Sequence, residues 1–505
     1  MEAVISVIVG ELATRSLSFL IDRYFKPATS KEDTIQKLQW MLLRVRLTVE
    51  EAEGRCITNQ TMLRQLSILR TVMYRGYYLL DTVIQQVPDE EKDKTDHGLG
   101  RFLSLSKFSP AKRVCFSAAN KYDAEQLKEM LENLEITITG MTEFVIFLRN
   151  YPPMCRQAYS TYLFMEKCMF CRQLEMEQVI IFLLHEEPPV HCNVGVLPIV
   201  GPGKVGKTTL VEHVCCDERV RDHFSHIIFL SDNDFREGKQ FKLRERSRIK
   251  HQPGDSNEEK FLVVVELVGN IDESTWRMLH SASESSIPKG SKVIITSRSD
   301  NILNFGTTQA LKLNFLSREA YWYYFRTLVF GSTDPEEHPK LASLAMAIID
   351  EYFDRNIHKA FTGPFIYLNN VANILKGSVG VQAWRQSLEC LRENWKQNGL
   401  MSSASLSHLG TINDRIFLRR ETKAIEYCVV HNQEHRIVLD NEEAPKINLL
   451  EIISGSVPPP QGKFEVLVWK SHLVPYQNHI YKCEILELEC KVSRNRQVHK
   501  RKVFS

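Results

Sequence analysis

The sequence predicts a multidomain protein with an N-terminal four-helix bundle, an α/β domain built on a parallel sheet with a helical subdomain, and a β-rich C-terminal tail. Three observations predict this fold class. The 505 residues correspond to about three domains. The first 150 residues carry helical apolar periodicity. Short, continuous apolar runs begin near residue 194, which is typical of strands in a parallel sheet.

The charge balance and the cysteine pattern narrow the class of protein. Lys and Arg total 64 against 62 for Asp and Glu, so a chain-wide affinity for nucleic acid or anionic membrane is not expected. The 12 cysteines follow no regular framework, which favours reduced thiols inside the cell. The apolar stretch from Val4 to Ile21 is interrupted by Glu11 and Arg15, so it predicts neither a signal peptide nor a membrane span. We expect a cytoplasmic protein, with the nucleus or a membrane surface as alternatives.

Residues 1–150 are expected to form the four-helix bundle. Apolar residues recur there at steps of three and four in four successive segments, and amphipathic helices of this kind bury their apolar stripes against one another. The four stripes run from Ile5 to Phe19, Ile35 to Val49, Met62 to Val83 and Leu127 to Leu148. A helical linker over residues 151–190 follows, bounded by proline pairs at both ends.

The next segments alternate between strand and helix patterns. Residues 191–310 hold four apolar runs that predict strands buried on both faces: Val194 to Val200, Ser225 to Leu230, Phe261 to Val268 and Lys292 to Thr296. Residues 311–400 are helical in pattern. Within the tail, residues 401–505, three strands are expected: Ile437 to Leu439, Phe464 to Trp469 and Ile480 to Leu488. No repeat of 20–50 residues is found, so leucine-rich repeats are not expected.

One motif carries specific chemistry. Residues 201–208 match the phosphate-loop pattern G-x-x-x-x-G-K-[ST], with a predicted strand before them and a predicted helix after them. This predicts an α/β P-loop NTPase domain that binds ADP or ATP with Mg²⁺. The glycines let backbone N–H groups surround phosphate oxygens, Lys207 reaches the β- and γ-phosphates, and the Thr208 hydroxyl ligates Mg²⁺. The predicted nucleotide-binding residues here are Gly201, Pro202, Gly203, Lys204, Val205, Gly206, Lys207, Thr208 and Thr209.

A phosphate loop needs an acidic residue at the end of a neighbouring strand to hold the metal, and a second acid to orient water. The run that begins at Phe261 is followed by Glu266, which we expect to hold Mg²⁺ together with Thr208, and then by Leu267, which cannot orient water. The sequence therefore favours nucleotide binding over turnover. It predicts at most a weak ATPase and no assigned catalytic residue. Arg298 follows another strand and is expected within reach of the γ-phosphate, with a surface arginine as the alternative.

An ordered set of segments resembles the plant coiled-coil NB-ARC disease resistance proteins with an Rx-type N-terminus. The resemblance extends over about residues 1–375, and its segments are 201–208, Asp217 to Leu230, Lys260 to Leu267, Gly290 to Arg298 and Leu311 to Ser317. It implies an NB-ARC nucleotide-binding domain at 191–310 and an ARC-like helical subdomain at 311–400. The segment from Arg172 to Glu175 is similar to the arginine-containing segment that borders the nucleotide pocket. Arg172 is thus a further nucleotide-binding residue that the resemblance implies.

The sequence also departs from the family. Glu266 and Leu267 stand where the family has paired aspartates, and of the acidic motif on the third helix only Asp81 matches. Gly363-Pro364-Phe365 is what remains of the segment whose proline packs on adenine. With these departures and without leucine-rich repeats, the chain resembles a divergent member of the family, of the grass type.

The resemblance implies a molecular switch in plant innate immunity. ADP would hold the closed form, and exchange to ATP would release residues 1–150 to self-associate or to engage another coiled-coil NB-ARC receptor. The alternatives are a slow signalling ATPase and a helper or decoy scaffold without switching. A nucleic-acid-binding role for the basic stretch from Arg236 to Lys250 is least favoured, because few aromatic residues lie within it for base stacking.

Three tyrosines on the third predicted helix suggest where such a partner binds. Residues 77 and 78 point about 100° apart on a helix, so Tyr74, Tyr77 and Tyr78 cannot all face one core. We therefore expect at least one exposed ring that pairs with another coiled-coil domain. The alternative is that the rings pack elsewhere within the same chain.

Overall fold

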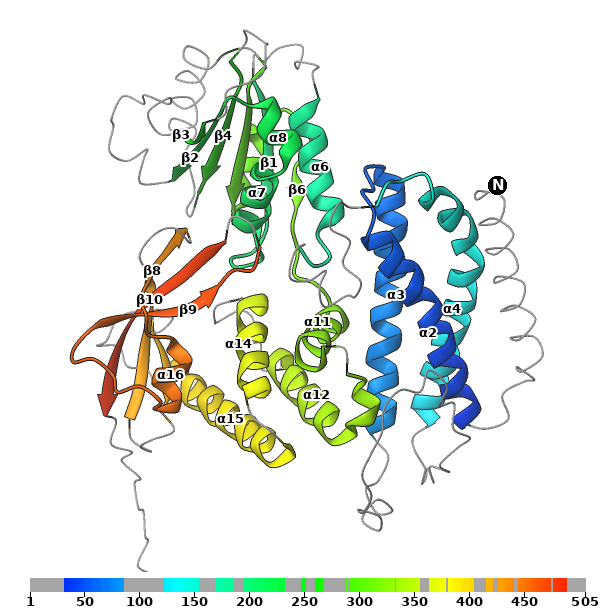
Figure 1. Ribbon diagram of the computed structural model, residues 1–505, viewed down its shortest axis with the longest axis vertical. Coiled ribbons are helices and arrows are strands. Elements are labelled where there is room, and N and C mark those ends of the chain that lie inside the picture. The colour runs from blue at the N-terminus through cyan, green and yellow to red at the C-terminus, as the bar shows by residue number, and fades with distance from the viewer. Residues whose placement is uncertain are drawn as a thin grey trace, which may run out of the picture. The chain divides into compact units, whose positions relative to one another are not determined.

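The structure is a computed structural model. It describes residues 31–85, 121–153, 169–185, 194–231, 247–250, 259–267, 288, 290–331, 333–354, 363–377, 380–403, 415–420, 426–439, 444–473 and 476–487. The chain divides into two compact units, Met1–Phe353 and Asp354–Ser505 (Figure 1), and each is described by itself. Among the described helices, none combines the length and the apolar character that a membrane crossing requires.

Three long helices lie at the start of the first unit, and each packs against the other two (Figure 1). They are α2 (Lys31–Glu53), α3 (Gln60–Gln85) and α4 (Lys121–Leu148). Their predicted apolar stripes are buried, with Leu42, Leu80 and Leu134 almost fully so. Helices α2 and α3 approach closely at Gly76, where an added Cβ would lie 2.4 Å from a methyl carbon of Leu42. The first predicted helix, Ile5 to Phe19, lies outside the described residues.

A six-stranded sheet forms the core of the region that carries the phosphate-loop motif. Its strands are β1 (Gly195–Val200), β2 (His226–Ser231), β3 (Ser247–Lys250), β4 (Phe261–Glu266), β5 (Lys292–Ser297) and β6 (Leu311–Lys312), in the order β3-β2-β4-β5-β1-β6. All neighbours are parallel except the edge pair of β2 and β3. The four strands predicted from apolar runs are confirmed, and β1, β4 and β5 are buried along nearly their whole length. The carboxyl ends of these three strands meet at one edge of the sheet.

Along the chain, helices lie before, between and after the strands of this sheet. They are α6 (Gln173–Leu184), α7 (Lys207–Cys215), α8 (Glu218–His223), α11 (Arg318–Phe330) and α12 (Pro339–Asp354), with 3-10 turns η3 (Asp300–Phe305) and η4 (Pro335–Glu337). Helix α7 starts directly at the phosphate loop, and α6 packs against α7 and α8. Ser317 caps α11 by accepting a hydrogen bond from the Ala320 N–H at 3.2 Å, so the helix begins soon after β6.

The expectation that a tyrosine of α3 is exposed is wrong. Tyr74 and Tyr77 are 3% and 7% exposed, and Tyr78 is partly buried, with its hydroxyl donating a 2.9 Å hydrogen bond to Asp350 of α12. Both buried rings pack against Tyr323 of α11, at centroid distances of 4.7 and 5.6 Å. The physical reason is that α3 contacts α11 as well as α2 and α4, so a second core receives the residues that the first cannot hold. Packing within the chain, the alternative reading, is the one observed.

A buried polar cluster completes this contact between α3 and α11. Asp81 Oδ2 accepts a 2.8 Å hydrogen bond from Trp322 Nε1, and Arg326 Nε lies 3.4 Å from the same oxygen. The Arg326 guanidinium also lies over the Tyr77 ring, 4.8 Å from its centroid. Asp81 is 4% exposed, and burial raises the pKa of its carboxyl, although Arg326 and Trp322 act in the opposite direction. We call Asp81, Trp322 and Arg326 the α3–α11 polar cluster.

The second unit combines helices with an antiparallel sheet. Its elements are α14 (Pro364–Gly377), α15 (Val381–Ser403), β7 (Arg415–Arg419), β8 (Glu426–Leu439), α16 (Leu449–Ser454), β9 (Phe464–Lys470) and β10 (Gln477–Glu487). The four strands lie in the order β7-β8-β10-β9. The β-rich character of the tail is confirmed, with β8 beginning eleven residues before the predicted Ile437 and β7 found in addition. A buried cluster that includes Val430, Ile452 and Val466 forms the core of this unit.

Candidate nucleotide-binding site

The phosphate loop connects β1 to α7, and its backbone has the conformation that its glycines permit. The N–H of Gly201 donates to the carbonyl of Ser297 at 3.3 Å, which ties the start of the loop to the end of β5. A Cβ on Gly201 would lie 2.2 Å from the carbonyl oxygen of Leu313, so a larger residue would not fit there. Lys204 and Gly206 have positive φ angles of 64° and 98°, and Gly206 caps α7. The N-terminus of α7 thus opens onto the loop, where a helix favours phosphate.

Lys207 folds back over the loop. Its Nζ donates to the carbonyl oxygens of Gly201 at 2.7 Å and Pro202 at 2.9 Å. The pKa of Lys207 is lowered to about 8, first by burial and then by the charge of Arg298, while Glu266 acts in the opposite direction. An anion bound beside this amine would reverse that shift, because opposite charges favour the protonated form.

Thr208 and Glu266 lie side by side, as a shared metal would require. The Thr208 hydroxyl donates a 2.6 Å hydrogen bond to Glu266 Oε1 at the end of β4. The sequence predicts Glu266 on a strand adjacent to β1, but β5 lies between β4 and β1 in the sheet. The carboxylate still reaches Thr208, since parallel strands end at the same edge and glutamate is one methylene longer than aspartate.

These two side chains fit Mg²⁺ in the way that P-loop sites usually hold it. Mg²⁺ prefers oxygen ligands and takes most of its shell from water and phosphate, with one or two protein oxygens. The described residues contain no group of three or more His, Cys, Asp or Glu side chains that would form a metal site without phosphate. Thr208 and Glu266 are therefore suited to a Mg²⁺ that arrives with a nucleotide.

Arg298 extends from the end of β5 over the phosphate loop. A Cβ on Gly203 would lie 3.2 Å from Arg298 Nε, so the guanidinium is in contact range of the loop backbone. Its charge lowers the pKa of Lys204 as well as that of Lys207, in both cases after burial as the larger cause. Three cationic side chains therefore converge on one loop. Such like charges repel one another until an anion joins them, which suits a polyphosphate.

Arg172 lies beside the site at the N-terminus of α6 and is 4% exposed. Its guanidinium donates to Glu175 Oε1 at 2.7 Å and to the carbonyl of Asn314 at 2.5 Å. Asn314 directly follows Leu313, the residue that covers Gly201. The Leu313 N–H also donates to Val200 at 2.8 Å, so Arg172 braces the segment that closes one side of the loop. Direct contact between Arg172 and nucleotide stays a prediction.

Leu313 and Asn314 were not predicted as site residues. They belong to the segment after β6, which pairs with β1 through two residue pairs, Ile199–Leu311 and Val200–Lys312. A two-residue strand leaves no periodic signal in a sequence. Leu313 lies in the segment Leu311 to Ser317 that carries the family resemblance, but its close approach to Gly201 depends on the tertiary arrangement.

Leu267 packs into the core of the sheet. It is 3% exposed, belongs to the apolar cluster that includes Val200 and Ile295, and its N–H donates to Thr296 at 2.9 Å. Of the other loop residues, Val205 is buried, Pro202 is exposed, and Thr209 is partly buried in the first turn of α7. The position that would carry a water-orienting acid is thus an apolar core position in this chain.

Comparisons with curated proteins identify relatives among plant disease resistance proteins. The chain is similar to the disease resistance protein RGA2 of Solanum bulbocastanum, with 23% identity over 335 residues that make up 63% of this chain and 33% of the relative. It is 24% identical over 393 residues to the putative disease resistance RPP13-like protein 1 of Arabidopsis thaliana, covering 72% of this chain and 35% of the relative. The putative disease resistance protein RGA1 of Solanum bulbocastanum is 22% identical over 333 residues, which cover 63% of this chain and 32% of the relative.

The chain spans about a third of the length of these relatives. No family model matches it. Among solved structures, C. elegans PCH-2 aligns with a TM-score of 0.30 and 14% identity, over 44% of this chain and 68% of that one. The relatives that share sequence with most of this chain are thus plant disease resistance proteins, in agreement with the family that its motifs resemble.

Proposed function

We propose that this protein is an ADP- and ATP-dependent molecular switch in plant defence, in which the nucleotide controls whether the N-terminal helices stay docked. The observation that carries the proposal is the phosphate loop. It joins a buried strand to a helix N-terminus, has glycine where a side chain would not fit, and gathers Lys204, Lys207 and Arg298. The similarity to plant disease resistance proteins supports the defence role.

The amine of Lys207 has a clear role in nucleotide binding. It is held by two backbone carbonyls, which are neutral acceptors. A phosphate oxygen is a charged acceptor and makes a stronger hydrogen bond with an ammonium group. Nucleotide would therefore draw Lys207 away from Gly201 and Pro202, and Arg298 would approach the outer phosphate from the end of β5.

Thr208 and Glu266 would hold Mg²⁺, the hydroxyl directly and the carboxylate directly or through water. The ion would supply charge neutralisation between the β- and γ-phosphates. The chain's own residues supply little for hydrolysis, because Leu267 is packed in the core where an acid would orient water. We infer a site that distinguishes ADP from ATP mainly by binding, with slow turnover.

A short path connects the loop to the N-terminal helices. Leu313 covers Gly201, and the helix α11 starts a few residues later at Arg318. Helix α11 in turn binds α3 through the α3–α11 polar cluster and the ring of Tyr323. A γ-phosphate that shifts Leu313 would therefore act on the helix that holds α3. This continuity supports the release of the N-terminal helices as the output of the switch.

The binding step is tested with Lys207→Ala. The variant loses a charge-assisted contact of about 1.5–3 kcal/mol, so the dissociation constant for ADP with Mg²⁺ should rise about 10- to 150-fold. Lys128→Ala is a matched control, because Lys128 lies on the exposed face of α4 near Glu132. Calorimetric titration of both variants decides the matter. Equal affinities in the wild type and Lys207→Ala would refute nucleotide binding through this loop.

The switching step needs a separate measurement. We expect hydrogen exchange in residues 318–330 and in α3 to be faster with a slowly hydrolysed ATP analogue than with ADP, because undocking exposes both helices. Helix α4 serves as an internal reference, since its packing partners are α2 and α3. If both nucleotides bind and the exchange of α11 is the same with each, the chain binds nucleotide but does not switch in this way.

A further inference from the structure

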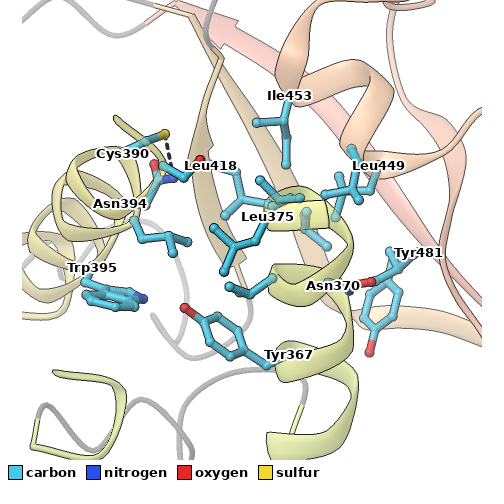
Figure 2. Close-up of a pocket in the computed structure, with 17 residues that line it drawn as sticks. Tyr367, Asn370, Leu375, Cys390, Asn394, Trp395, Leu418, Leu449, Ile453 and Tyr481 are labelled. Atoms are coloured by element: carbon cyan, nitrogen blue, oxygen red, sulfur yellow. Dashed lines mark hydrogen bonds between the residues drawn. The ribbon is translucent and has the colours of Figure 1, made fainter. Parts of the chain in front are cut away.

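The second unit contains a cavity of about 150 Å³ that the nucleotide site does not use. Helices α14, α15 and α16 and the antiparallel sheet all contribute to its walls, so it lies inside this unit (Figure 2). Its walls are mostly aliphatic, and none of its lining residues carries a charge. A volume of about 150 Å³ is sufficient for a single aromatic ring.

The polar groups of the cavity lie mainly on its helical side. Helix α14 contributes Tyr367 and Asn370, and α15 contributes Ser387, Cys390 and Asn394. Figure 2 shows the Tyr367 hydroxyl and the Trp395 indole on the same side as Asn394, with Leu449 and Ile453 lying apart from them. The cavity therefore has a mostly apolar end formed by α16 and the sheet, where Tyr481 contributes a hydroxyl, and a hydrogen-bonding end formed by α14 and α15.

The hydrogen-bonding end combines the buried side chains of Asn394 and Trp395 with the partly exposed side chains of Ser387 and Cys390. Asn394 is buried, and its side-chain amide donates to Cys390 Sγ at 3.8 Å, the contact drawn in Figure 2. Burial raises the pKa of Tyr367 well above its ordinary value, partly offset by the side chain of Trp395. The phenol is therefore neutral at physiological pH. A charged ligand would lose its hydration in this cavity and find no opposite charge among the lining residues.

We propose that this cavity is a binding site for a small, uncharged aromatic molecule that carries one hydrogen-bonding group. The ring would lie against Leu375, Leu418 and Ile453, and its polar group would face Asn394 and Tyr367. Ligand pockets typically combine apolar walls with a few placed polar groups, as this one does. The volume limits the ligand to about one ring or a small fused pair, of the size of phenol or indole.

The test uses the full-length protein and indole as the probe. Cys390 lines the cavity and is partly exposed, so a bound molecule should shield its thiol from alkylation by iodoacetamide. Cys56, an exposed cysteine of the first unit, is the internal control. With indole at ten times its dissociation constant about nine sites in ten are filled, so alkylation of Cys390 should slow about tenfold while that of Cys56 is unchanged. Peptide mass spectrometry measures both rates in one sample.

Two further arms make the result specific. Benzoate has a single ring but carries a charge, so it should leave the alkylation rate of Cys390 within twofold of the unliganded value. Leu418→Trp fills the apolar end, and indole should then protect Cys390 at least tenfold less. Unchanged alkylation of wild-type Cys390 at 10 mM indole would overturn the proposal, and so would equal protection by benzoate. These two wild-type results decide the question even if Leu418→Trp does not fold.

Discussion

Replacing Arg326 with methionine is expected to destabilise the first unit strongly, because it leaves the carboxylate of Asp81 buried without a cation. Asp81 Oδ2 forms an ion pair with Arg326 Nε at 3.4 Å and accepts a hydrogen bond from Trp322 Nε1 at 2.8 Å. Methionine retains much of the apolar contact with the Tyr77 ring but removes the charge above it. The substitution therefore tests the electrostatic part of the contact more than its packing.

The magnitude follows from the geometry. Two unit charges 3.4 Å apart attract by about 5 kcal/mol at an effective dielectric constant of 20. The carboxylate will take up a proton in the variant, which limits the loss, and the cation–π contact with Tyr77 adds a part of its own. We expect a net loss of about 3–5 kcal/mol, as is usual when one partner of a buried ion pair is removed. At roughly 2–4 °C per kcal/mol, the melting temperature should fall by about 6–20 °C.

The pKa of Asp81 determines how the stability loss of Arg326→Met changes with pH. Burial raises that pKa in the folded state, so a protonated Asp81 stabilises the fold and this contribution is lost as the pH rises through the folded pKa. The deficit of Arg326→Met should therefore shrink as the pH falls from 7 towards about 4, where the carboxyl protonates in the unfolded chain too. Adding Asp81→Asn to Arg326→Met should recover most of the stability at pH 7, since the amide is neutral and retains an acceptor for Trp322.

Differential scanning calorimetry of the wild type, both single variants and the double variant gives a double-mutant cycle. The reasoning requires a coupling of at least about 2 kcal/mol between residues 81 and 326, above the scatter expected for independent sites. The reasoning is refuted if Arg326→Met melts within 2 °C of the wild type, or if Asp81→Asn fails to rescue it.

Three further predictions concern the nucleotide site. Leu267→Asp should lower stability by about 3–5 kcal/mol without raising single-turnover ATP hydrolysis, because the acid enters the sheet core; faster hydrolysis would contradict this. Nucleotide affinity should fall by up to tenfold per pH unit as the pH rises through about 8, because the free protein then loses the proton on Lys207. An affinity that stays constant from pH 7 to 9.5, or the same pH dependence in Lys207→Met, would argue against this prediction. Gly201→Ala should weaken ADP binding at least tenfold by pushing Leu313 aside. Gly140 has open space around it, so Gly140→Ala should bind ADP normally and gain up to about 1 kcal/mol in the free energy of unfolding. Equal effects of the two alanines would disprove the steric argument.

The parts of the fold that sequence patterns predicted are those with a strong local signal. Strands β1, β2, β4 and β5 are continuous apolar runs because they are buried on both faces, and short runs of this kind are typical of buried strands. Strand β3 is polar, lies at the edge and pairs antiparallel with β2, so it has no such signal. Strand β6 has two residues, too few for any periodicity.

The aromatic residues of α3 show a different kind of limit. Periodicity correctly indicated that Tyr74, Tyr77 and Tyr78 cannot share one core. It could not indicate the second core, because the residues that form it, such as Tyr323, lie about 250 positions away in the chain. The missing information was the tertiary contact, and the default of exposure was the wrong choice.

In the nucleotide site, the phosphate-loop motif predicted the elements because its geometry is local. Strand, loop and helix follow one another in sequence, so the motif at residues 201–208 alone locates the loop between β1 and α7. The surroundings of the loop come from distant segments. Glu266 was found because an acid at the end of an apolar run is a readable pattern, whereas Leu313 contributes its backbone carbonyl, which every residue has.

In the proposed switch, nucleotide would not be the single input to the state of α3, because this helix is buried on two sides. The rings of Tyr74 and Tyr77 are covered by α11 and its neighbours, so they become accessible only when α3 separates from α11. Docking within the chain and association with another molecule through these rings are therefore mutually exclusive. Whatever binds the uncovered rings shifts the equilibrium by mass action, in proportion to its own concentration. A rise in the abundance of that partner, or of the protein itself, would act on the same equilibrium as an exchange of ADP for ATP.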